Sequence, residues 1–132
     1  MKNRIGGIVA VLLLAFVVLS CTTANISELK FGKNDTAEPA STTFKTGEEI
    51  FAVATVSNAS EKLHLTWNIT YNNVPGKAKG ESVGQKTIDF EGAKQLWQQF
   101  SSPLPGEYKV DATLTDDSGK QIDSKSGMVT VK

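Results

Sequence analysis

Cysteine and histidine are nearly absent from this sequence, and their scarcity excludes several kinds of site. The 132 residues include one cysteine, Cys21, and one histidine, His64. A single thiol cannot form an intrachain disulfide, so packing alone has to hold the fold together. Zinc and copper sites usually need three or four nitrogen or sulfur ligands. We therefore expect no metal site and no cofactor.

The sequence also lacks an excess of positive charge. Its 14 Lys and Arg residues balance 14 Asp and Glu residues. Once Lys2 and Arg4 near the N-terminus are set aside, 12 basic residues face 14 acidic ones, and they are scattered along the chain. Proteins that bind nucleic acid normally carry a basic patch or stripe. We therefore expect no nucleic-acid partner.

Catalytic motifs are missing as well. His64 is the one candidate base of its type, and no G-x-S-x-G motif surrounds a serine. Asp116 and Asp117 lie in a predicted hairpin turn, where Asp is favoured for its turn geometry. With Asp123 they could hold calcium only loosely, because the spacing is not that of an EF-hand. We expect no catalytic residues, although a pocket that gathered His64 with two carboxylates would favour an enzyme.

One long hydrophobic run is present, close to the N-terminus. Residues 5–19 follow Lys2 and Arg4 and contain no charge over fifteen positions. This is the arrangement of a secretory signal peptide. A helix of that length would span roughly 22 Å, short of the roughly 30 Å hydrocarbon core of a bilayer. The run therefore predicts a signal segment, and a retained membrane helix would need help from its flanks.

The end of this run resembles the lipobox of bacterial lipoproteins, with the residues Val18-Leu19-Ser20-Cys21. The resemblance implies that Cys21 receives a diacylglycerol and becomes the N-terminus after cleavage, and several acyl chains give stable anchoring. Thr22 at the next position implies the outer membrane in a two-membrane cell. An ordinary cleaved signal with an incidental cysteine, or a signal anchor, remains an alternative.

Alternation of hydrophobic and polar residues dominates the rest of the chain. We predict a signal peptide over 1–20, a lipidated N-terminus and tether over 21–25, and one domain over 26–132. The clearest strands are LHLTWNITY (63–71) and YKVDATLT (108–115), which alternate throughout. EIFAVATV (49–56) is hydrophobic on both faces and suits a central strand. Shorter strands are predicted over 27–31, 86–90 and 128–132, with a bulge at Gly127.

One segment, EGAKQLWQQF (91–100), allows two interpretations. Ala93, Leu96, Trp97 and Phe100 have helical spacing, but the neighbouring strands favour a strand. In a strand, Trp97 shares one face with Gln95 and Gln99, and these three residues are the candidate binding site: an exposed aromatic side chain between two amides can stack on a sugar or contact a protein. The alternative, which we favour from sequence, places Trp97 in the core.

About seven short strands in roughly 110 residues predict an all-β fold, a single antiparallel sandwich. LPGEYKV (104–110) resembles the entry to the sixth strand of fibronectin type III and immunoglobulin-like domains, where a tyrosine follows a Pro-Gly turn. Trp67 resembles the core tryptophan of these folds. The chain departs from true immunoglobulin domains because it lacks their paired cysteines. The resemblance implies an immunoglobulin-like sandwich and leaves the function open.

These observations predict a non-enzymatic envelope lipoprotein that acts as an interaction or accessory module. Its partners would be the membrane, through the lipid on Cys21, and an envelope protein or polysaccharide. The alternative is a lipid-anchored inhibitor of a hydrolase, which would insert a loop such as 72–80. A small hydrolase is the least expected of the three.

Overall fold

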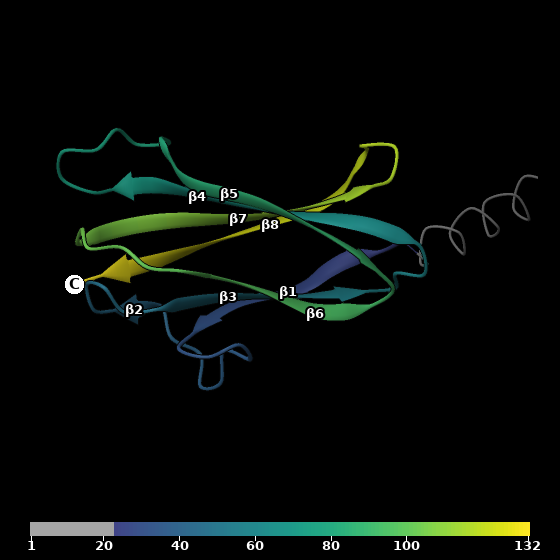
Figure 1. The fold of residues 1–132 in the computed structure, drawn as a ribbon, viewed down its shortest axis with the longest axis horizontal. Helices are drawn as coiled ribbons and strands as arrows, with labels where there is room; N and C mark the ends of the chain where they lie inside the picture. Colours follow the sequence, from purple (N-terminus) through teal and green to yellow (C-terminus); the bar gives the residue numbers. More distant parts are fainter. Residues whose placement is uncertain (1–22) are drawn as a thin grey trace, which may run out of the picture.

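Two β-sheets face each other across one hydrophobic core in the computed structural model, which describes residues 23–132 (Figure 1). Cys21 and the predicted signal peptide lie outside the described residues. Among residues 23–132, no helix is long and hydrophobic enough to cross a membrane. The described chain forms eight strands: β1 (Asn25–Gly32), β2 (Thr43–Phe44), β3 (Ile50–Ser57), β4 (Lys62–Asn73), β5 (Ser82–Glu91), β6 (Lys94–Phe100), β7 (Gly106–Asp116) and β8 (Gln121–Val131).

The strands form a three-stranded sheet in the order β1-β3-β6 and a five-stranded sheet in the order β2-β8-β7-β4-β5. In Figure 1 the three-stranded sheet is the lower layer, and β4, β5, β7 and β8 form the upper one. Every pairing is antiparallel except that between β2 and β8. The predicted all-β sandwich is confirmed, with β2 as a short strand that the sequence analysis did not identify.

The core consists of the side chains that alternation assigned to one face of each long strand. Trp67 on β4 and Tyr108 on β7 are among its largest fully buried members. Because directly opposed residues in antiparallel strands point to the same face, each pairing brings hydrophobic side chains together. The buried residues that the long strands place in this core include Ile50, Ala52, Ala54, Leu63, Leu65, Ile69, Val110, Ala112, Leu114 and Val129.

The turn before β7 is fastened to the core by a tyrosine, as the resemblance to immunoglobulin-like domains implied. The Tyr108 hydroxyl donates a hydrogen bond to the Leu104 carbonyl at 2.7 Å and lies 2.6 Å from Ser102 Oγ. Gly106 adopts a φ of 147°, and a side chain there would meet the Asn73 carbonyl at 2.6 Å. The Pro-Gly turn is therefore required both for backbone conformation and for space.

Two details of the sequence analysis are corrected by the structure. Residues 94–100 form strand β6, so the helical alternative is wrong. The bulge predicted at Gly127 is also absent: the described register of β7 and β8 shifts between Leu114 and Thr115 instead. Gly127 has a packing role, because a Cβ atom there would lie 2.5 Å from the Phe31 ring. The ring of the facing sheet occupies the space that a side chain would fill.

Candidate interaction surface

Trp97 lies on the outer face of the three-stranded sheet with 45% of its surface exposed. The core position that we favoured from sequence is therefore wrong. β6 pairs with β3 along its whole length, and Leu96 and Phe100 are opposed to the buried residues Ala54 and Ile50. These side chains occupy the inner phase of β6. Because side chains alternate along a strand, Trp97 has to point outward.

The surroundings of Trp97 form a mixed aromatic and amide surface. The Phe51 ring on β3 lies 5.6 Å from the Trp97 ring, with an interplanar angle of 54°. Gln95 and Gln99 share the outward phase of β6 with Trp97, and Gln99 Nε2 donates to Glu49 Oε2 at 2.9 Å. This arrangement offers a flat hydrophobic ring and hydrogen-bonding amides to a partner, the combination that is frequent at binding hot spots.

A pocket of about 240 Å³ opens on the other side of the same strand, between the edges of β5 and β6. Its lining includes Trp67, Ile69, Gly84, Lys86, Gln98 and Phe100. Lys86 is opposed to Trp67 and Gly84 to Ile69, so both face the inner side of the sandwich. The sequence could have indicated this pocket, because Gly84 and Lys86 continue the inward phase of Ile88 and Phe90.

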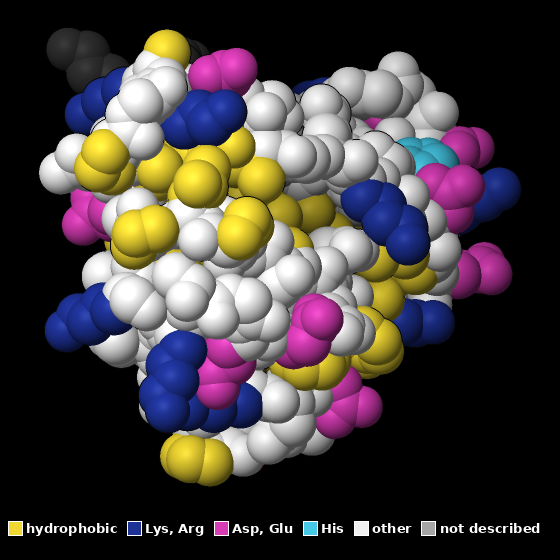
Figure 2. Space-filling model, turned by 60° about the vertical axis from the view of Figure 1, so that its left-hand side comes forward, with side chains coloured by type: hydrophobic (Ala, Val, Ile, Leu, Met, Phe, Trp, Pro, Cys, Tyr) yellow, Lys and Arg dark blue, Asp and Glu magenta, His cyan; other side chains and the backbone are white. Residues whose placement is uncertain are grey.

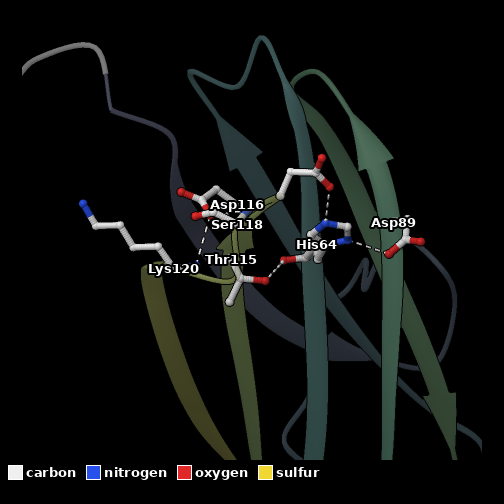
Figure 3. A network of polar contacts seen from close by, with 7 residues as sticks. His64, Asp89, Thr115, Asp116, Ser118 and Lys120 are labelled. Carbon is white, nitrogen blue, oxygen red and sulfur yellow. Dashed lines mark hydrogen bonds and ion pairs between the residues drawn. The ribbon is translucent and has the colours of Figure 1, made fainter.

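His64 lies on the outer face of the five-stranded sheet between two carboxylates (Figure 3). Its Nδ1 is 2.6 Å from Asp89 Oδ1 on β5, and its Nε2 is 3.1 Å from Asp117 Oδ1 in the β7–β8 turn. These hydrogen bonds, first that to Asp89 and then that to Asp117, raise the pKa of His64 above its ordinary value. In Figure 2 the histidine lies beside acidic side chains at one side of the view.

This histidine cluster lacks the features of a catalytic centre. Both ring nitrogens are occupied by carboxylates, so neither is available as a base toward a substrate. The structure does gather His64 with two carboxylates, but His64 does not line the pocket between β5 and β6. The side chains therefore link β4, β5 and the β7–β8 turn, and the arrangement favours a structural role.

The three aspartates considered for calcium take separate structural roles. Asp116 Oδ1 accepts hydrogen bonds from the Ser118 hydroxyl and from the Lys120 and Ser118 amides of the hairpin turn. These bonds, first that from the Ser118 hydroxyl, lower the pKa of Asp116. Asp123 Oδ2 accepts from the Ile26 amide at 2.8 Å, which ties β8 to β1. Within residues 23–132, no group of three or more Cys, His, Asp or Glu residues is arranged to hold a metal ion.

Comparison with known proteins identifies the fold and no family. No family model matches this chain, and no curated protein matches it. The chain is similar to part of a Bacteroides uniformis beta-glucuronidase (TM-score 0.55, 14% identity, 82% of this chain and 14% of that chain). It is also similar to a Paenibacillus cycloisomaltooligosaccharide glucanotransferase (TM-score 0.54, 13% identity, 83% and 14%) and to the C-terminal domain of wzt (TM-score 0.53, 10% identity, 83% and 74%). At these identities the likeness concerns the sandwich fold alone.

Proposed function

We propose that the protein is a non-enzymatic, lipid-anchored interaction module of a bacterial envelope, held at the membrane through Cys21. In this proposal the lipid fixes the position of the domain, and the outer face of β6 contacts an envelope partner. The observation that carries it is the exposure of Trp97 between Gln95 and Gln99. Trp97 is 45% exposed beside the Phe51 ring, and exposed aromatic side chains next to hydrogen-bonding amides are enriched at binding surfaces.

The β6 surface is tested by affinity capture with two matched variants. The full-length protein is purified from membranes in detergent, immobilised, and exposed to detergent-solubilised envelopes of the producing bacterium. Trp97→Ala removes the candidate contact, and Met128→Ala removes the other exposed large hydrophobic side chain of the described chain, on the opposite sheet. We expect one stoichiometric partner that Met128→Ala retains and Trp97→Ala loses at least tenfold. Equal capture by all three forms would contradict the proposed surface.

The anchor is tested separately by mass spectrometry of the intact protein extracted from membranes. The proposal expects cleavage before Cys21 and an added mass that corresponds to diacylglycerol and, usually, a further acyl chain. A Cys21→Ser form should lose this mass and leave the membrane fraction. A Cys21→Ser form that stays acylated and membrane-bound would refute the lipoprotein assignment.

A hydrolase inhibitor is the second candidate, supported by the ordered loop between β4 and β5. Val74 in this loop is buried, Lys77 N donates to the Val74 carbonyl at 3.0 Å, and Gly80 N donates to the Tyr71 carbonyl at 2.8 Å. The Lys77 ammonium also lies 5.7 Å from the Tyr71 ring centre. Figure 1 shows the loop at the same end of the molecule as the C-terminus. Purified protein that lowers the activity of one envelope hydrolase, with a loss of effect in Lys77→Ala, would favour this candidate.

A further inference from the structure

The sheet edges within residues 23–132 are protected to different degrees. Exposed strand edges invite pairing with other chains, and proteins normally block them with bulges, charges, short strands or covering loops. β1 is blocked in two ways: its register shifts between Ile26 and Glu28, and the following loop returns along its end, where Ser41 N donates to the Phe31 carbonyl at 2.8 Å. β2 consists of two residues. These two edges offer little free backbone to another strand.

The edges of β5 and β6 lie on the other side of the sandwich and differ from each other. β5 has a register shift opposite Ile69 and Thr70 and carries Lys86 on its inward face, and inward charges discourage strand pairing. β6 has one of these features, because Lys94 is opposed to the buried Val56 and takes the inward phase at the first residue of the strand. Its other six residues are uncharged, and all seven pair with β3 without a shift. From Gln95 to Phe100, β6 therefore presents a regular, uncharged edge that pairs with no further described strand.

The pocket beside this edge is open because three core-facing positions lack hydrophobic side chains. Gly84 and Lys86 occupy two of them on β5, and Gln98, opposed to the buried Ala52, occupies the third on β6. A Cβ atom on Gly84 would meet nothing within 4 Å. Ile69 and Phe100 provide hydrophobic walls in the same pocket. The space can therefore receive a side chain from a strand laid along β6.

The polar lining of this pocket carries one positive charge, Lys86, and no negative one. Trp67 is 1% exposed, and its Nε1 is the buried side-chain nitrogen that lacks a hydrogen-bond partner among the described residues. An indole N–H and a lysine ammonium can only donate, and Lys86 forms no ion pair within the described part of the chain. No carboxylate lines the pocket. The amides of Gln98 and Gln99, which also line the pocket, supply acceptor oxygens, so the group that the pocket lacks is an anion to balance Lys86.

We propose that β6 binds an extended segment of a partner protein by β-strand addition, with an acidic side chain of that segment entering the pocket toward Lys86. Backbone hydrogen bonds to β6 supply affinity, and the pocket supplies specificity for the acidic residue. This inference rests on the proposed function, because it takes the partner of the interaction module to be a protein. It adds the site, the binding mode and the chemistry of the bound segment.

The test uses the full-length protein in detergent and a displayed library of random nonapeptides as the probe. We expect enriched peptides with Asp or Glu at one fixed position. Gly84→Leu, which fills the pocket, should weaken their binding at least tenfold, and so should methylation of alternate peptide amides. Thr87→Leu is the matched control, since Thr87 is opposed to Thr66 on the outer face of the same two strands. Circular dichroism melting confirms that both variants fold.

Other outcomes would overturn the inference in distinguishable ways. Failure to enrich any peptide, or equal binding of the peptides by Gly84→Leu, excludes strand addition at this pocket. Preference for basic or neutral peptides excludes the acidic segment. A wild-type dimer in sedimentation experiments that Gly84→Leu dissociates would assign the edge to a second copy of this chain. An envelope partner that Trp97→Ala loses and Gly84→Leu retains would leave the proposed function standing and refute this inference alone.

Discussion

Trp67 and Trp97 each lie in the middle of an alternating strand, yet Trp67 is 1% exposed and Trp97 is 45% exposed. Trp67 faces inward from a central strand of the five-stranded sheet and is covered by the opposite layer. Trp97 faces outward from the edge strand of the three-stranded sheet, where no described layer covers it. The comparison teaches that an aromatic residue in a strand serves packing or contact according to which face it occupies. Substitutions at the two tryptophans should therefore differ in their effects on stability and on partner binding.

Trp67→Ala should have the largest effect on stability. Truncating a fully buried aromatic side chain removes its packing and leaves a cavity, which costs about 3–5 kcal/mol. Chemical denaturation followed by circular dichroism measures the loss in the free energy of unfolding. If Trp67→Ala lowered stability no more than Trp97→Ala does, the assignment of Trp67 to the core would be wrong.

Tyr108→Phe should have the next largest effect, because it breaks the polar contact that fastens the turn before β7. The Leu104 carbonyl and Ser102 Oγ lose the hydroxyl that contacts both of them. Leaving buried polar groups without this partner costs about 1–3 kcal/mol. Tyr71→Phe is the control, since Tyr71 is only partly buried. Equal denaturation midpoints for the two variants would contradict a special role for Tyr108.

Trp97→Ala should lower the free energy of unfolding by about 0.5–1.5 kcal/mol, because the main described aromatic contact it removes is the tilted pair with Phe51. Partner capture should fall far more strongly than stability. Measuring both on the same preparation separates the two roles. A stability loss comparable to that of Trp67→Ala would place Trp97 with the core residues instead.

The smallest effect is expected from His64, whose contacts lie on the surface of the other sheet. Its pKa is raised in the folded state by Asp89 and Asp117, so the folded protein binds its proton more tightly than the unfolded chain does. The stabilisation is complete below the unfolded pKa of about 6.5 and is lost as pH rises through the folded pKa. Denaturation midpoints measured from pH 6 to pH 9 should therefore fall in the wild type. His64→Gln should flatten this part of the profile, and an unchanged slope would exclude His64 as its source.

Residue alternation was sufficient to predict the long strands and most of the core. The stretches 63–71 and 108–115 lie within β4 and β7, and their inward residues were assigned correctly at Trp67 and Tyr108. The resemblance of LPGEYKV to immunoglobulin-like domains also predicted that a tyrosine packs at the turn before β7. Less could be predicted for β6, because seven residues satisfy both a helical and a strand pattern when no partner is known.

The sequence by itself determined that this chain forms an all-β sandwich, since a period of two with turn residues between the runs is compatible with little else. Only the tertiary structure decided which face of β6 is covered and which sheet edges are free. β6 carries large hydrophobic side chains on both faces, Leu96 and Phe100 on one and Trp97 on the other, so alternation did not state which face meets the opposite layer. The register of β4 with β5 and of β3 with β6 placed Gly84, Lys86 and Gln98 around one pocket, and left Trp97 on the outside.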